Sequence, residues 1–128
     1  MTPSLTEGEF VFCCLTGGRG GDQVELGAVA SIVEDEGLTL ILPRERAVEH
    51  GLAFASVFRR ITLNVHSSLD AVGLTAAVSR QLTDHGISAN VVAGYHHDHF
   101  FVHTERAEDA LVAMRALAAA APTADEEE

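Results

Sequence analysis

The spacing of hydrophobic residues changes between residues 60 and 86, and this change constrains the fold more than any other feature. Ile61, Leu63 and Val65 alternate with polar residues, which is typical of a strand with one buried face. In 70–86 the apolar stripe instead repeats every three or four positions, as in a half-buried helix. That stripe consists of Ala71, Leu74, Thr75, Val78 and Leu82. A strand followed directly by such a helix predicts helices layered on a sheet.

Two more strands and a second helix follow. Ile87–Ala93 alternates again, Gly94–Asp98 predicts a turn, and His99–His103 predicts a strand. Thr104 is a suitable N-cap for a last helix. The apolar stripe of that helix is Ala107, Ala110, Leu111, Met114, Leu117 and Ala118. Residues 58–120 therefore have the order β-α-β-β-α, which indicates an α+β, ferredoxin-like βαββαβ sandwich with an antiparallel sheet and a missing fourth strand.

The first half of the chain or a partner chain must supply that strand, and the best candidate lies in the first half. Phe10–Leu15 is apolar at every position, as in a strand covered on both faces. Strands are also predicted at Ala28–Val33 and Leu38–Leu42, and a short helix at Pro43–His50, which Gly51 ends. The expected organisation is two tandem or interlocked halves with flanking segments: a flexible arm (1–8), a first half (9–57), a second half (58–119) and a disordered acidic tail (120–128).

Composition excludes several classes of partner. The chain has 8 basic and 19 acidic residues and a net charge of −11, whereas proteins that bind nucleic-acid phosphates cluster Lys and Arg. No segment reaches the ~20 apolar residues of a membrane span, and MTPSLTEGEF lacks the features of a secretory signal. Cys13 and Cys14 are adjacent in a predicted strand, so they point to opposite faces and cannot form an ordinary disulfide. We therefore expect a reduced, cytoplasmic protein without nucleic-acid or membrane partners.

Three segments resemble a known family. They are EGLTLILPRE (36–45), FRRITLNVHSSLDAVGLTAAVS (58–79) and GISANVVAGYHHDHFFV (86–102). Together they resemble a bacterial family of short, two-part ACT-domain proteins, which is similar in turn to the ACT repeats of the animal cytosolic arginine sensors. The resemblance implies paired ACT units of ferredoxin-like fold, sheets joined across a homodimer, and no enzymatic activity. The first half departs from the pattern, because 16–27 is too short and too rich in Gly for the first ACT helix.

ACT domains commonly bind amino acids at the loop after the first strand, and the resemblance places that loop at His66–Thr75, facing Ile87–Val92. A helix N-terminus also offers unpaired N–H groups and partial positive charge to a carboxylate, and Gly73 would allow close approach to the backbone. Ordinary helix capping explains the same residues equally simply. The predicted ligand-binding residues are Ser67, Ser68, Val72, Gly73, Leu74, Asn90 and Asp98, with Asn90 or Asp98 expected to meet the ligand's ammonium group.

Two other polar groups have simpler interpretations. The outer sheet face, with Thr62, Asn64, Ser88 and Asn90, is expected to face water or a dimer partner. A second group contains residue types that bind Zn²⁺: His96, His97, Asp98, His99 and His103. Strand alternation, however, sends Asp98 to the opposite side from His97 and His99. We therefore expect solvated histidines and no metal or other cofactor.

The resemblance, together with these patterns, implies a regulatory module that binds a small molecule, most plausibly an amino acid, and works as a homodimer. An enzyme is not expected, because no Ser–His–Asp or Cys–His arrangement can be placed. The Gly-rich segment 17–21 (GGRGG) also lacks the Gly-Lys-Ser/Thr of a phosphate-binding loop. Two alternatives remain: an ACT-like structural or protein-interaction dimer without a ligand and, as the weaker one, a metal-binding protein built on the histidine cluster.

Overall fold

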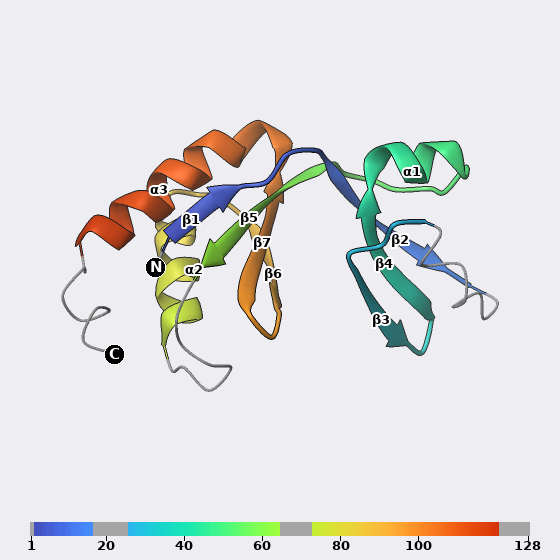
Figure 1. The fold of residues 1–128 in the computed structure, drawn as a ribbon, viewed down its shortest axis with the longest axis horizontal. Helices are drawn as coiled ribbons and strands as arrows, with labels where there is room; N and C mark the ends of the chain where they lie inside the picture. Colours follow the sequence, from blue (N-terminus) through green and yellow to red (C-terminus); the bar gives the residue numbers. More distant parts are fainter. Residues whose placement is uncertain (1, 17–25, 65–72, 121–128) are drawn as a thin grey trace. The chain divides into compact units, whose positions relative to one another are not determined.

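The computed structural model describes residues 2–16, 26–64 and 73–120. They belong to two compact units, an N-terminal unit of Gly8–Phe58 and a C-terminal unit that combines Met1–Glu7 with Arg59–Glu128 (Figure 1). Each unit has a hydrophobic core of its own. No helix in the described ranges is long and apolar enough to span a membrane.

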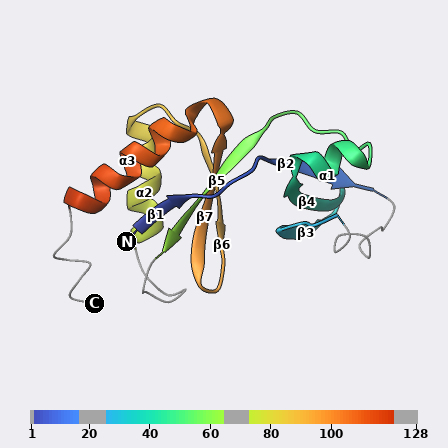
Figure 2. The same ribbon diagram turned by 45° about the horizontal axis from the view of Figure 1, so that its top comes forward.

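The C-terminal unit has the predicted ferredoxin-like arrangement. Its strands lie in the order β1 (Thr2–Leu5), β5 (Phe58–Asn64), β7 (His97–His103) and β6 (Ala89–Ala93). Helices α2 (Leu74–Asp84) and α3 (Ala107–Ala120) cover one face of this sheet (Figures 1 and 2). The order β-α-β-β-α is therefore confirmed, and the sheet is antiparallel where β1 pairs with β5 and where β6 pairs with β7.

The fourth strand is β1, and not Phe10–Leu15 as the sequence predicted. β1 pairs antiparallel with β5, from Thr2 opposite Asn64 to Leu5 opposite Ile61. The prediction of a flexible arm at 1–8 is wrong for the same reason. A short segment with a proline gives no period-two signal, yet an edge strand tolerates proline because one side of its backbone needs no partner.

Most buried residues of the C-terminal unit come from one sheet face and both helices, while Phe101, at 1% exposure, is buried on the opposite sheet face. Ile61, Leu63, Phe100 and Val102 are fully buried on the sheet. The helices contribute Val78, Leu82, Ala107, Ala110, Leu111, Ala113 and Met114. The predicted stripes are confirmed at these positions except Ala113, which the α3 stripe did not include. A 3-10 turn at Thr104–Arg106 precedes α3, so this helix begins at Ala107 and not directly after Thr104.

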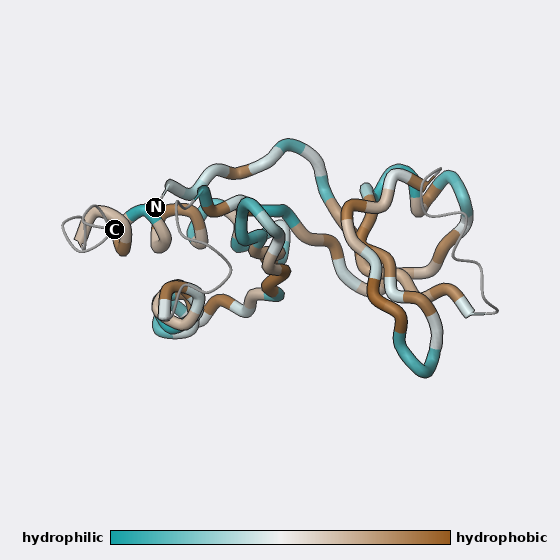
Figure 3. Tube along the Cα trace, turned by 60° about the horizontal axis from the view of Figure 1, so that its bottom comes forward, coloured by the Kyte–Doolittle hydropathy of each residue, from teal (hydrophilic) through white to brown (hydrophobic). Residues whose placement is uncertain are grey.

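The N-terminal unit repeats the strand order with fewer helical residues. β3 (Ala30–Glu34), β4 (Gly37–Pro43) and β2 (Phe10–Leu15) are neighbours, and Phe10 pairs with Phe58, the first residue of β5. Figure 3 shows the hydrophilic turn between β3 and β4 at the tip of this hairpin. Helix α1 (Arg44–Glu49) is followed by Gly51, whose φ of 67° confirms the predicted helix end.

The core of this unit is small. It consists of Val11, Cys13, Leu26, Leu40, Leu42 and Ala47. Cys13 is buried, which raises the pKa of its thiol, while Cys14 is exposed, as expected for neighbours on a strand. The segment GGRGG and the acidic residues 121–128 lie outside the described residues.

Candidate ligand site

The first turn of α2 is the part of the predicted site that the structure describes. Helix α2 begins at Leu74, later than the sequence indicated, with Gly73 as its N-cap. Gly73 has φ 88° and ψ −13°, a left-handed conformation that suits glycine. Among the described residues no side chain caps this N-terminus, and its first turn holds no acidic residue. It therefore has the partial positive charge of a helix N-terminus, and no carboxylate of its own first turn offsets that charge.

Asp98 lies beside this turn. The Thr75 hydroxyl donates a hydrogen bond to Asp98 Oδ2 at 3.3 Å, joining α2 to the first part of β7. Thr75 was predicted on the buried stripe, but it is exposed. The structure thus brings Gly73, Leu74 and Asp98 to one end of the C-terminal unit, together with Thr75, which the sequence had not indicated as a polar site residue.

Asn90 lies on the other face of the sheet. In the β6–β7 ladder Asn90 is opposite Phe101, whereas Asp98 is opposite Ala93. Directly paired residues share a face and successive residues alternate, so Asn90 and Asp98 point to opposite sides. Within the C-terminal unit Asn90 is therefore not brought together with the α2 N-terminus. Ser67, Ser68 and Val72 lie outside the described residues.

The sheet face without helices carries a chain of polar contacts. Thr6 Oγ1 lies 3.4 Å from Thr62 Oγ1, and Thr62 Oγ1 lies 3.1 Å from His99 Nδ1. Burial lowers the pKa of His99, the positive charges of Arg60 and His97 lower it further, and Asp98 opposes them. This face therefore disfavours an added positive charge at His99.

The histidines near the β6–β7 turn form ring contacts. The ring centroids of Tyr95 and His96 are 5.0 Å apart, and those of His97 and His99 are 6.5 Å apart. In the ranges that the structure describes, no three His, Cys, Asp or Glu side chains lie close enough to hold a metal ion. Asp98 contacts α2 and His99 contacts Thr62, so the predicted separation of these two side chains is confirmed.

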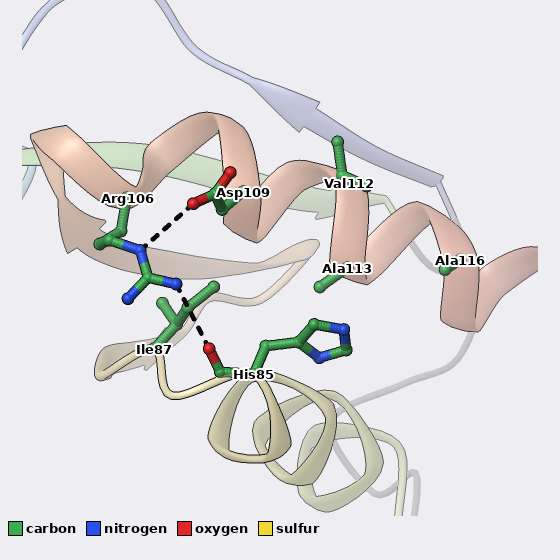
Figure 4. A pocket seen from close by; sticks show the side chains of 7 residues that line it. All are labelled: His85, Ile87, Arg106, Asp109, Val112, Ala113 and Ala116. Atoms are coloured by element: carbon green, nitrogen blue, oxygen red, sulfur yellow. Dashed lines mark hydrogen bonds and ion pairs between the residues drawn. The ribbon is translucent and has the colours of Figure 1, made fainter.

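A groove of about 300 Å³ lies between the end of α2 and α3 (Figure 4). Its lining residues are His85, Ile87, Arg106, Asp109, Val112, Ala113 and Ala116. Arg106 donates to the carbonyl oxygens of His85 and Gly86, each at 3.3 Å, and to Asp109 Oδ2 at 3.4 Å. Its guanidinium group therefore satisfies carbonyls at the C-terminal end of α2. The sequence analysis did not indicate this groove, because no local pattern reports the distance between two helices.

Sequence families match both units in turn. One ACT-domain family matches residues 1–59, and a second ACT-domain family matches residues 56–116. The chain is a tandem ACT-domain protein. A search of curated proteins finds no match.

Solved structures with the same fold include a near relative of this ACT protein. A protein of unknown function from Vibrio cholerae, described as a possible transport protein, is 50% identical with a TM-score of 0.83, over 88% of this chain and 86% of that one. A protein from Agrobacterium tumefaciens is 17% identical with a TM-score of 0.69, over 90% of this chain and 87% of that one.

The regulatory subunit of aspartate kinase from Thermus thermophilus, in its ligand-free form, has a TM-score of 0.62. It is 10% identical to this ACT protein, over 89% of this chain and 94% of that one. At this low identity the comparison shows a shared fold.

Proposed function

We propose that this tandem ACT protein is a regulatory module that binds an amino acid and has no catalytic activity of its own. ACT domains are typically ligand-binding regulatory modules, and the regulatory subunit of an aspartate kinase has the same fold. The observation that carries the proposal is the position of Asp98 beside the first turn of α2.

The chemistry of an amino acid fits this arrangement. The ligand carboxylate would accept hydrogen bonds from N–H groups at the start of α2, where Gly73 leaves the backbone accessible. Asp98 would accept from the ammonium group, because a zwitterion needs an acceptor opposite its donors. Ser67, Ser68 and Val72 directly precede this turn in sequence and remain part of the proposed site, whereas Asn90 does not.

We also propose that the protein works as a cytoplasmic homodimer. ACT domains generally oligomerise. An edge strand with exposed apolar residues supports such an assembly: in β3, Ile32 is 50% exposed and Val33 is 87% exposed.

A thermal-shift screen with the twenty amino acids tests the ligand. A ligand at 100 times its dissociation constant should stabilise the protein by about 2.7 kcal/mol, which raises the melting temperature measurably. Asp98→Asn should reduce the affinity about tenfold, because the ammonium group loses its charged acceptor. Asp84→Asn, an equal charge change at the other end of α2, should leave the affinity unchanged.

Gly73→Val tests the carboxylate end of the site. The left-handed backbone makes valine costly at this position, so the matched control is Gly86→Val, at φ 71° and equally open. Both variants should be less stable, but only Gly73→Val should lose the response to the ligand. If no amino acid raises the melting temperature at millimolar concentration, the sensor function is wrong and the ligand-free interaction dimer takes its place.

A further inference from the structure

The solvent-facing side of helix α3 has an unusual order of charges. The exposed residues of α3 are Glu108, Asp109, Val112, Arg115, Ala116, Ala119 and Ala120. Val112 is 65% exposed and lies at the centre of this set. In Figure 4 its side chain points away from α2, while that of Ala113 points toward α2. The face therefore presents one apolar side chain between an acidic end and a basic end.

Asp109 precedes Val112 by three residues, and Arg115 follows Val112 by three residues. Residues three apart lie on the same face of a helix. Consider a two-fold axis that passes through Val112 at right angles to the helix. It would place Asp109 of each copy opposite Arg115 of the other copy, which gives two ion pairs of opposite charge. This is the self-complementarity that an isologous interface requires.

We propose that this face of α3 binds a second copy of the chain, with the two α3 helices antiparallel and the Val112 side chains meeting at the two-fold axis. The inference rests on the homodimer proposed above and names its surface. Ala116 and Ala119 are exposed on this side of α3 and add no bulk beyond Cβ, so a second helix can approach α3 closely.

The charges on this face of α3 also favour a second copy of the chain as its partner. A net charge of −11 opposes self-association, so a stable contact between copies needs a cation that can pair with an acidic residue of the other copy. Arg115 is exposed and makes no ion pair or hydrogen bond with any other residue of the described ranges. Asp109 is paired with Arg106, but its side chain is 69% exposed and can meet a second cation.

Sedimentation equilibrium of the full chain tests the surface. Val112→Glu should weaken the dimer about 100-fold, because two carboxylates would face each other across the axis without a counter-charge. The variant should remain folded, since Val112 makes little contact with the core. Arg80→Glu, on the exposed surface of α2, makes a larger charge change elsewhere and should leave the dimer intact.

Mixing two single variants gives the sharper test. Arg115→Glu and Asp109→Lys should each dimerise about tenfold more weakly, because each homodimer contains two like-charge contacts. In the mixed heterodimer both contacts again join opposite charges, so the mixture should associate nearly as tightly as the unmodified protein.

The outcomes separate this inference from the proposed function. A monomeric unmodified protein would overturn both the homodimer and this surface, while leaving the ligand screen as an independent test. A dimer that Val112→Glu does not weaken, or a mixture that associates no better than its components, would overturn the surface alone and direct attention to the β3 edge.

Discussion

The two ACT units share a strand order but differ in the helices that cover the sheet and in the strand that completes it. The C-terminal unit has two helices, and its sheet is completed by β1 from the other end of the chain. Among its described residues, the N-terminal unit has one helix, α1, and β3 has four exposed residues out of five. A shared topology thus supports a full core in one unit and a small one in the other.

The difference indicates why the proposed ligand site belongs to the C-terminal unit. An anion site at a helix N-terminus needs a helix long enough to have a dipole and a polar group beside its first turn. Helix α2 has eleven residues and Asp98 beside its start. Helix α1 has six residues and follows Pro43, which has no N–H group to offer.

Removing residues 1–7 should have the largest effect, because it should destabilise the C-terminal unit and leave the N-terminal unit unchanged. The C-terminal unit should lose about 4 kcal/mol of unfolding free energy, because Leu5 leaves the core and the β1–β5 ladder is lost. Urea denaturation measures the total loss, and hydrogen exchange shows where it falls. Amides of β2 and β4 should keep their protection. Loss of protection there instead would mean that the two units do not unfold separately.

A substitution at Gly37 tests the smaller unit. Its φ is 152°, and an added Cβ would lie 2.6 Å from the Leu15 carbonyl oxygen. Gly37→Ala should therefore lower the unfolding free energy by about 3 kcal/mol and reduce the protection of β2 and β4 amides from hydrogen exchange. Gly51→Ala is the matched control: φ is 67° but nothing lies within 4 Å, so about 1 kcal/mol is expected. Equal losses of unfolding free energy in the two variants would show that the β3–β4 turn can shift to accommodate the added Cβ.

The smallest expected effect is a pH dependence from His99. Its pKa is lower in the folded protein, so above the unfolded-state pKa of about 6.5 both states are neutral and His99 adds no pH dependence. As the pH falls below that value the unfolded state binds the proton first, and stability decreases by at most about 1.4 kcal/mol per pH unit. His99→Gln, which can still bond Thr62, should flatten this part of the stability curve. An unchanged slope would place its origin at other histidines.

Much of the C-terminal unit could be predicted from local pattern. The change from period two to the helical period marked β5 and α2, and the buried residues Ile61, Leu63, Val78 and Leu82 follow from it. Gly51 follows α1 as expected, and Gly86, the last residue of the predicted range 70–86, follows α2; both have positive φ. The start of α2 was predicted too early, at residue 70, because the helix begins at Leu74 and its N-cap is a glycine, which has no capping side chain to mark the boundary.

The sequence by itself determined the order of elements and the main core face of the C-terminal unit, because period and local propensity act over neighbouring residues. The ACT family followed from the resemblance of three segments to known ACT-domain proteins, which the family matches confirm. Only the tertiary structure decided which segment completes the second sheet, because strand pairing joins Thr2–Leu5 to β5 across more than fifty residues of chain. It also decided that Asp98 meets the start of α2, whereas strand alternation in the sequence had already placed Asn90 on the outer sheet face. Strand register and helix packing bring Asp98 and α2 together, and local sequence does not place one element against another.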